Sequence, residues 1–152
     1  MQGITPFLWF DGNAEEAANF YVSVFKNSKI KQVTRYPEGA PAPAGQAMVV
    51  AFELGGREFL ALNGGPMFKF TEAVSFVVNC ENQEEIDHYW EKLTSGGGKP
   101  GQCGWLKDKF GLSWQIVPTA IGRLMSDPKR APRVMAEVMK MTKLDLKKME
   151  DA

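Results

Sequence analysis

The sequence predicts an α+β fold in which two tandem β-α-β-β-β modules are followed by C-terminal helices. The first observation is a duplication, because Asn13-Ala14-Glu15-Glu16 recurs 69 residues later as Asn82-Gln83-Glu84-Glu85. Each copy follows a short apolar stretch and precedes an amphipathic stripe with an aromatic pair. The second observation is that residues 119–152 lie outside the repeat and have a helical pattern. A repeat of this kind indicates one architecture built twice.

The first module, about residues 1–66, is expected to start with a strand over Ile4–Phe10. Both alternating sets of residues are apolar there, as in a strand that is buried on two faces. Asn13 is then expected to cap a helix, with Glu16 reaching back to it in a capping box. The apolar stripe of this helix is Ala17, Phe20, Tyr21 and Val24. Three further strands are expected at Lys29–Tyr36, Met48–Leu54 and Glu58–Leu62, with Gly55-Gly56 as a hairpin turn.

The segment from Pro37 to Gly45 separates the second and third of these strands and consists mainly of proline, alanine and glycine. A segment of this composition can be an irregular connection, or it can be a flap over a pocket. The sequence leaves both interpretations open.

The second module, about residues 67–118, repeats the pattern in a more compact form. Val74–Cys80 is the expected first strand, and Asn82 with Glu85 forms the second capping box. Gly96-Gly97-Gly98 is expected to end the helix. Its apolar stripe is Ile86, Tyr89, Trp90 and Leu93. Short strands are expected around Cys103–Lys107 and Leu112–Val117.

The C-terminal tail, about residues 119–152, is expected to be helical, with Asp127 as a cap and Pro128 at the first helical position. The apolar stripe of this tail is Ala131, Val134, Met135, Val138, Met141, Leu144, Leu146 and Met149. Since the stripe lies outside the duplication, we expect it to pack onto the sheet or onto another subunit.

The composition argues against several classes of partner. The chain of 152 residues has 18 Lys and Arg and 18 Asp and Glu, so no basic excess recruits nucleic acid. No stretch is long and apolar enough to span a membrane. The two cysteines, Cys80 and Cys103, are too few for a disulfide framework and suit a reducing compartment. We therefore expect a cytoplasmic protein without a nucleic-acid or membrane partner.

Three blocks of the sequence together resemble the PhnB-like branch of the vicinal-oxygen-chelate superfamily, which includes glyoxalase I, extradiol dioxygenases and bleomycin-resistance proteins. They are Ile4 to Ala17, Gly104 to Ile116, and the tail that begins with Asp127-Pro128. The resemblance implies one domain over residues 1–152, strands that curl into two half-barrels around a cleft, and a homodimer. This branch is often described as 3-demethylubiquinone-9 3-methyltransferase-like.

Metal-dependent members of this superfamily hold a divalent ion with His or Gln on the first strand and Glu on the last strand of each module. Such an ion needs carboxylate or imidazole donors. The corresponding positions here are Pro6, Ser75, Leu60 and Gln115. None of these is a carboxylate or an imidazole, so the resemblance implies no metal site and no cofactor. A slip in register would bring in Glu58, which lies two residues from Leu60 on the same strand face.

The candidate ligand-binding residues are Ser75, Asn79, Trp105, Lys107 and Gln115. Ser75, Asn79 and Gln115 are polar residues in otherwise apolar strands, so they need partners from a structural hydrogen-bond network or from a ligand. Trp105 and Lys107 alternate on the adjoining strand, where an aromatic wall with a cation at its edge suits a planar or anionic ligand. Packing of Trp105 in the core is the alternative. The expected apolar floor of the cleft is Leu8, Phe10, Leu60 and Leu62.

Catalytic residues cannot be assigned from the sequence. His88 is the only histidine and lies off the helical stripe, which argues against a Ser-His-Asp arrangement. No glycine-rich turn of a Rossmann-type sheet is recognisable, although methyl transfer commonly uses one. The leading hypothesis is metal-independent binding of a small, partly apolar molecule. The alternatives are an enzyme of the glyoxalase type with an altered metal site, methyl transfer to a quinone precursor, and an assembly module with a degenerate cleft.

Overall fold

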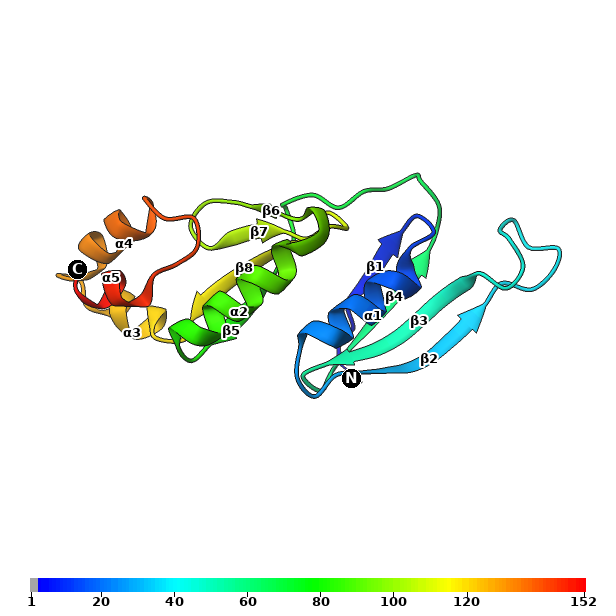
Figure 1. The fold of residues 1–152 in the computed structure, drawn as a ribbon, viewed down its shortest axis with the longest axis horizontal. Helices are drawn as coiled ribbons and strands as arrows, with labels where there is room; N and C mark the ends of the chain where they lie inside the picture. Colours follow the sequence, from blue (N-terminus) through cyan, green and yellow to red (C-terminus); the bar gives the residue numbers. More distant parts are fainter. Residues whose placement is uncertain (1–2) are drawn as a thin grey trace. The chain divides into compact units, whose positions relative to one another are not determined.

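The computed structural model describes residues 3–152, and the chain divides into two compact units, residues 1–69 and 70–152. Each unit contains one four-stranded mixed sheet with one long helix against it (Figure 1). The predicted α+β class is therefore confirmed, and the strands form two four-stranded sheets. Among the described residues, no helix has both the length and the apolar character needed to cross a membrane.

The first unit has the predicted β-α-β-β-β order. Its elements are β1 (Phe7–Phe10), α1 (Ala14–Val24), β2 (Lys29–Arg35), β3 (Ala47–Leu54) and β4 (Arg57–Asn63). The strand order is β1-β4-β3-β2, with β1 parallel to β4 and the other pairs antiparallel. The stripe of α1 packs on this sheet, where the ring centroids of Tyr21 and Phe52 are 6.3 Å apart and those of Phe52 and Phe59 are 5.5 Å apart.

Strand β1 is shorter than predicted and is not buried on two faces. Leu8 and Phe10 are 6% and 3% exposed, whereas Phe7 is 54% exposed. The buried side chains belong to the face that α1 covers, because Leu8 pairs with the fully buried Ala61 of β4. The apolar character of the exposed set therefore does not reflect burial within this unit.

The capping box predicted at Asn13 is wrong. The side chain of Asn13 makes no cap hydrogen bond, and its backbone (φ −117°, ψ 23°) is not in the extended conformation that aims a cap side chain at the helix. Asn63, the last residue of β4, replaces it, because its Oδ1 accepts a hydrogen bond from Ala14 N at 2.9 Å.

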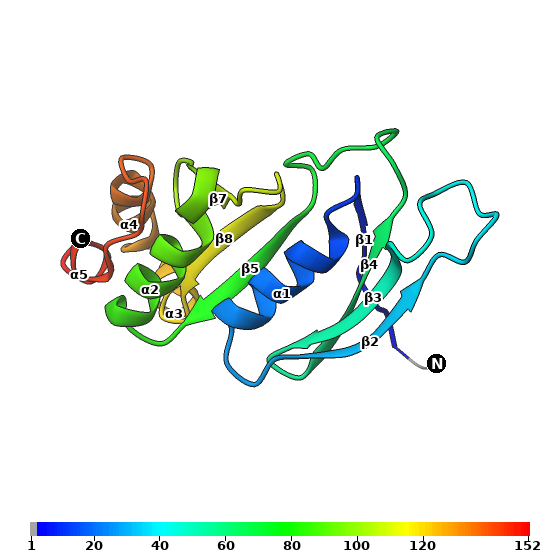
Figure 2. The same cartoon turned by 45° about the vertical axis from the view of Figure 1, so that its right-hand side comes forward.

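The second unit has the same order, and the three strands after its helix are shorter than those of the first unit. Its elements are β5 (Ser75–Cys80), α2 (Gln83–Thr94), the short 3-10 helix η1 (Ser95–Gly97), β6 (Lys99–Pro100), β7 (Trp105–Lys107) and β8 (Ser113–Pro118). The strand order is β5-β8-β7-β6, with β5 parallel to β8. Helix α2 runs along one face of this sheet (Figure 2). The predicted β-α-β-β-β order requires a strand at the place of β6, but the sequence did not locate it, because two residues are too few to show a periodicity.

The cap predicted for α2 is confirmed. Asn82 Oδ1 accepts a hydrogen bond from Glu85 N at 2.9 Å, and Asn82 has an extended backbone. The carboxylate of Glu85 accepts in turn from Glu81 N at 3.5 Å, one residue before the cap. This second helix start is therefore stabilised by a local motif.

The tail forms three short helices, α3 (Ile121–Ser126), α4 (Ala131–Val138) and α5 (Leu146–Glu150), which gather at one end of the second unit (Figure 2). Helix α4 begins three residues later than predicted, because Asp127 and Pro128 form a turn in which Asp127 Oδ1 accepts from Lys129 N at 2.9 Å. Helix α3 lies in the part of the chain that was expected to be helical, although the sequence did not give its bounds. The tail has a core of its own, made of Leu124, Val134, Val138, Met141, Leu144 and Met149.

Candidate functional site

The five predicted ligand-binding residues lie on one face of the second sheet, on the side opposite α2. Gln115 of β8 lies directly opposite Val77 of β5 and opposite Trp105 of β7. Ser113 of β8 lies opposite Ser75 and opposite Lys107 in the neighbouring row. Because alternate residues of a strand point to the same side, these residues share a face with Asn79. We call this surface the polar face, defined by Ser75, Asn79, Trp105, Lys107, Ser113 and Gln115.

A hydrogen bond joins two of the predicted residues. Gln115 Nε2 donates to Ser75 Oγ at 2.9 Å, and both side chains are half-buried. A carboxamide has a second N–H and a carbonyl oxygen, and a hydroxyl has a further donor and acceptor. Both side chains can therefore make further hydrogen bonds to a ligand while they remain bonded to each other.

Ser113 was missed by the sequence reasoning. Its side chain is 0% exposed, and within residues 3–152 its Oγ has no hydrogen-bond partner. A buried hydroxyl without a partner costs about 1–3 kcal/mol, so Oγ would gain from a water or ligand oxygen. The signal that could have identified it is its position two residues before Gln115 on the same strand.

Lys107 forms an ion pair with Glu72, a residue of the segment before β5 that the sequence reasoning also missed. The hydrogen bond and the positive charge of Lys107 lower the pKa of the Glu72 carboxyl below its ordinary value. On the other side of Lys107, Lys99 of β6 lies directly opposite it. At its edge the polar face therefore has the ammonium group of Lys107, which holds a carboxylate, and the ammonium group of Lys99 lies beyond it on β6.

The tryptophan in the core of this sheet is Trp114, and Trp105 is half-buried on the polar face. Trp114 lies on the α2 side, where its ring centroid is 5.7 Å from that of Phe76. Its Nε1 donates to the buried carboxylate of Asp108 at 2.9 Å. Trp105, on the neighbouring strand, lies directly opposite Gln115.

The predicted apolar floor is wrong for two of its four residues. Leu60 and Leu62 of β4 lie opposite Phe7 and Trp9, not opposite Leu8 and Phe10. The latter two point to the α1 side of the sheet, because they occupy the alternate positions of β1. Glu58, the residue that a register slip was expected to offer, lies 3.8 Å from Lys31 Nζ and opposite Glu53.

The first strands of the two modules correspond with an offset of 70 residues, and the helix starts with an offset of 69. Leu60 and Gln115 occupy matching places in β4 and β8, with the same alternation of buried and half-buried residues around them. Leu60 pairs with Phe7, and Gln115 pairs with Val77. Asp11-Gly12 connects β1 to Asn13, whereas Glu81 alone connects β5 to Asn82. By strand pairing, the counterpart of Ser75 is therefore Thr5, one residue before Pro6.

The donor groups of the polar face do not suit a divalent metal ion. Hydroxyl and carboxamide groups are present at Ser75, Ser113 and Gln115, and the nearby carboxylate of Glu72 is paired with Lys107. Hard or borderline divalent ions prefer carboxylate and imidazole donors. Within residues 3–152 there is also no group of three His, Cys, Asp or Glu side chains that could hold a metal. His88 is exposed on α2.

A separate pocket of about 390 Å³ lies in the first unit. The loop between β2 and β3 lines it with Pro41, Ala42 and Pro43, as the flap interpretation of this segment requires. The remaining walls are Asp11, Gly12, Tyr36, Gln46, Asn63, Gly64 and Gly65. Tyr36 closes one side, since its hydroxyl donates to the carbonyl of Asn63 at 2.6 Å.

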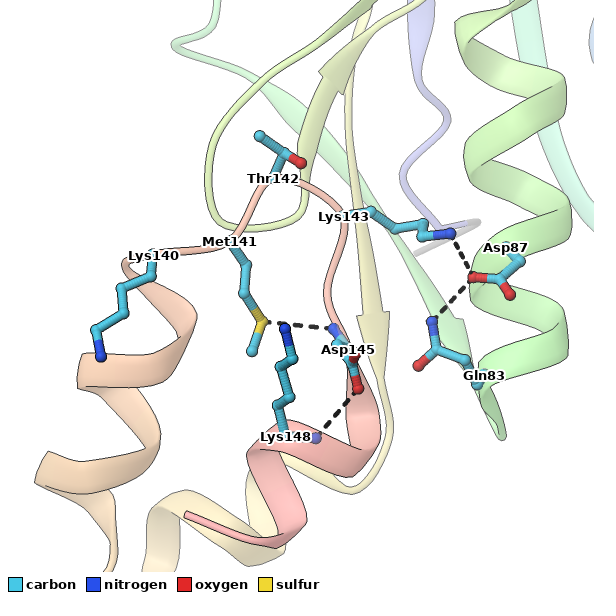
Figure 3. Close-up of a pocket in the computed structure, with 8 residues that line it drawn as sticks. All are labelled: Gln83, Asp87, Lys140, Met141, Thr142, Lys143, Asp145 and Lys148. Carbon is cyan, nitrogen blue, oxygen red and sulfur yellow. Dashed lines mark hydrogen bonds and ion pairs between the residues drawn. The ribbon is translucent and has the colours of Figure 1, made fainter.

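A pocket of about 440 Å³ lies where the tail meets the start of α2 (Figure 3). Asp87 accepts from Lys143 Nζ at 2.8 Å and from Gln83 Nε2 at 2.9 Å, and these hydrogen bonds lower the pKa of its carboxyl. Gln83 also accepts from Leu146 N at 2.8 Å and donates to the carbonyl of Leu144 at 3.0 Å. Because these groups bind one another, the pocket serves first to hold the tail against α2.

The chain is similar to a known protein family and to several solved structures. The model of the family described as 3-demethylubiquinone-9 3-methyltransferase matches residues 2–117, which end before the helical tail. A PhnB protein from Bacillus cereus, provisionally described as a 3-demethylubiquinone-9 3-methyltransferase, is 40% identical, with a TM-score of 0.72. The match covers 78% of this chain and 100% of that protein. No curated protein matches the chain.

Two less similar solved structures share the fold. The fosfomycin resistance protein FosX from Listeria monocytogenes, complexed with Mn(II) and sulfate, is 12% identical over 83% of this chain and 97% of its own, with a TM-score of 0.57. A glyoxalase-related enzyme from Fulvimarina pelagi is 16% identical over 80% of this chain and 91% of its own, with a TM-score of 0.51. At these identities the similarity concerns the fold alone.

Proposed function

This chain belongs to the 3-demethylubiquinone-9 3-methyltransferase-like family of PhnB proteins, and on that premise we propose that it binds a small, partly apolar molecule on its polar face without a metal ion. A fosfomycin-resistance protein and a glyoxalase-related enzyme share the fold, and one fold can host several chemistries. The function must therefore be argued from the side chains of this chain.

One observation carries the proposal, which is the row of Val77, Gln115 and Trp105 across the second sheet. A hydrogen-bonding carboxamide lies between an exposed aliphatic side chain and a half-buried indole. Small-molecule sites typically combine apolar and aromatic walls with a few polar groups that fix orientation. The unpartnered Oγ of Ser113 and the Ser75–Gln115 pair supply those polar groups.

The test uses benzamide, a neutral probe with one apolar ring and one amide group. In two-dimensional NMR titrations, we expect it to shift the Trp105 indole signal and the Gln115 side-chain signals, with an affinity on the order of millimolar. Gln115→Ala should weaken this binding, whereas His88→Ala, on the exposed surface of α2, should leave it unchanged. EDTA should have no effect. Tight one-to-one binding of Mn²⁺ or Zn²⁺ in calorimetry, or no shift on the polar face, would overturn the proposal.

Methyl transfer is the second candidate, because the description of the matching family names it. Its test is independent of the first. A ligand that binds the native state raises the melting temperature, so S-adenosylmethionine should do so if methyl transfer is the activity. The homodimer that the family resemblance implies and the cytoplasmic location expected from the composition do not enter this proposal, and both stay predictions.

A further inference from the structure

We propose that the ligand of the polar face carries an oxyanion, a carboxylate or phosphate group, and that the Glu72 carboxylate occupies its place on Lys107 until the ligand displaces it. This inference rests on the proposed function, and it adds the charge of the ligand and a residue that controls access to it.

The first support is one row of side chains across the whole second sheet. Ser75, Ser113, Lys107 and Lys99 lie opposite one another in successive strands, β5, β8, β7 and β6. Side chains directly opposite one another are neighbours, with Cβ atoms about 5 Å apart. The row thus holds two hydroxyl groups followed by two ammonium groups. Hydroxyl and ammonium donors side by side are suited to an oxyanion, which accepts several hydrogen bonds at once.

The second support is the state of Lys107. Its ammonium group already binds a carboxylate, that of Glu72, and the side chains of the two residues are 43% and 61% exposed. Exposed ion pairs are weak, because water and salt screen them. A carboxylate from a ligand can therefore exchange with the carboxylate of Glu72 without breaking any buried contact.

The third support, independent of the charges, is the unsatisfied hydroxyl of Ser113. This side chain is fully buried beside Lys107, and its Oγ has no partner within the described residues. The oxyanion that replaces Glu72 on Lys107 lies next to Ser113, which is opposite Lys107 in the sheet, and the hydroxyl of Ser113 donates to it. Displacement of one exposed carboxylate thus exchanges a single ion pair for an ion pair and a hydrogen bond.

The orientation of the ligand follows from the rows. The oxyanion binds to the row of Ser75, Ser113 and Lys107, while the apolar body of the ligand lies on the adjacent row, against Trp105 and Val77. Gln115 lies in that second row, and its hydrogen bond to Ser75 joins the two rows. The ligand is therefore a small amphiphile with a charged end and an apolar or aromatic end.

The experiment compares benzoate with benzamide, which have the same ring and nearly the same shape but differ in charge. Both are titrated by two-dimensional NMR into the wild-type chain, Glu72→Gln, Lys107→Gln and Ser113→Ala. Glu91→Gln is the matched charge control, because Glu91 is exposed on α2, which covers the opposite face of the sheet. The melting temperature of each variant reports whether it is folded.

We expect the wild-type chain to bind benzoate more tightly than benzamide. Glu72→Gln should tighten benzoate binding about two- to fivefold, the range that an exposed ion pair corresponds to, and Glu91→Gln should not. Lys107→Gln should weaken the binding of benzoate and leave that of benzamide nearly unchanged. Ser113→Ala should weaken the binding of benzoate more than that of benzamide. Raising the salt concentration should weaken benzoate binding alone.

Equal affinity for the two probes, or an equal response of Glu72→Gln and Glu91→Gln, would overturn this inference while leaving the proposed function intact. If neither probe shifts the signals of the polar face, the proposed function fails as well. If Lys107→Gln does not fold, Glu72→Gln decides the question, because it changes only an exposed carboxylate.

Discussion

The Oδ1 atom of Asn63 accepts a hydrogen bond from the backbone N–H of Ala14 at 2.9 Å, so the end of β4 caps the start of α1. Nδ2 of the same side chain donates to the carbonyl of Ala47 at 2.9 Å. One buried carboxamide therefore joins α1, β3 and β4. The first helix start depends on this tertiary contact, whereas the second depends on the local cap at Asn82.

This difference predicts an order of stabilities. Asn63→Ala leaves two buried backbone groups without partners and should lower the free energy of unfolding by about 2–5 kcal/mol. Asn82→Ala removes an ordinary cap and should cost about 1 kcal/mol. Asn13→Ala should cost less than about 0.5 kcal/mol, because its side chain makes no cap bond. Urea unfolding followed by circular dichroism measures all three, and an equal loss at Asn13 and Asn63 would contradict this account.

The core of the tail predicts a second stability effect. Leu144 is buried in that core, and a Cβ at Gly104 would lie only 3.0 Å from its Cγ, so the tail fits closely against the loop before β7. Leu144→Ala should cost about 2–4 kcal/mol in urea unfolding, because it creates a cavity. Met139→Ala is the control, since Met139 is 63% exposed and its truncation should change stability by less than about 0.5 kcal/mol. Equal effects would indicate that the tail does not pack in this way in solution.

The two cysteines should differ in reactivity. Burial, with smaller contributions from the charges of Glu85 and Glu81, raises the pKa of the Cys80 thiol to about 12. Thiolate is the reactive form, so Cys80 should not react with a disulfide reagent at pH 8 in the folded protein. Cys103 is half-buried and should account for the one thiol that reacts. Cys103→Ser should abolish this reaction, and a loss of reactivity in Cys80→Ala instead would show that the assignment is wrong.

The ion pair between Asp87 and Lys143 predicts that the stability of the fold depends on pH. The folded pKa of its carboxyl is lowered, first by the hydrogen bond from Lys143 and then by that from Gln83. A carboxyl with a lowered pKa stabilises the fold above its unfolded pKa, and this contribution is lost as the pH falls through the folded pKa. Lys143→Gln should raise the pKa of Asp87, as measured from its carboxyl ¹³C shift. Lys140→Gln should not, because Lys140 pairs with Glu137.

Much of the fold was predictable, because the periodicities of strands and helices are patterns of residues close together in the sequence. The alternation of Ser75, Val77 and Asn79 placed their side chains together on one face, and register then brought Gln115, Trp105 and Lys107 to the same surface. Glu72 and Ser113 could not be found in this way. Glu72 lies outside any strand, so alternation along a strand could not place it. Ser113 stands out only because its hydroxyl has no hydrogen-bond partner, and that depends on the residues which the fold brings around it.

Local sequence was sufficient for the type and order of the main elements, and for the cap at Asn82, because these depend on residues a few positions apart. Pairing between distant strands decided which face each side chain occupies. Two residues, Asp11-Gly12, connect the first strand to its helix, but Glu81 alone connects the second. This difference of one residue shifts the position that corresponds to Ser75 from Pro6 to Thr5. Since side chains alternate along a strand, it also puts Leu8 and Phe10 on the side of the sheet that α1 covers. Only the hydrogen bonds between the strands determine this register.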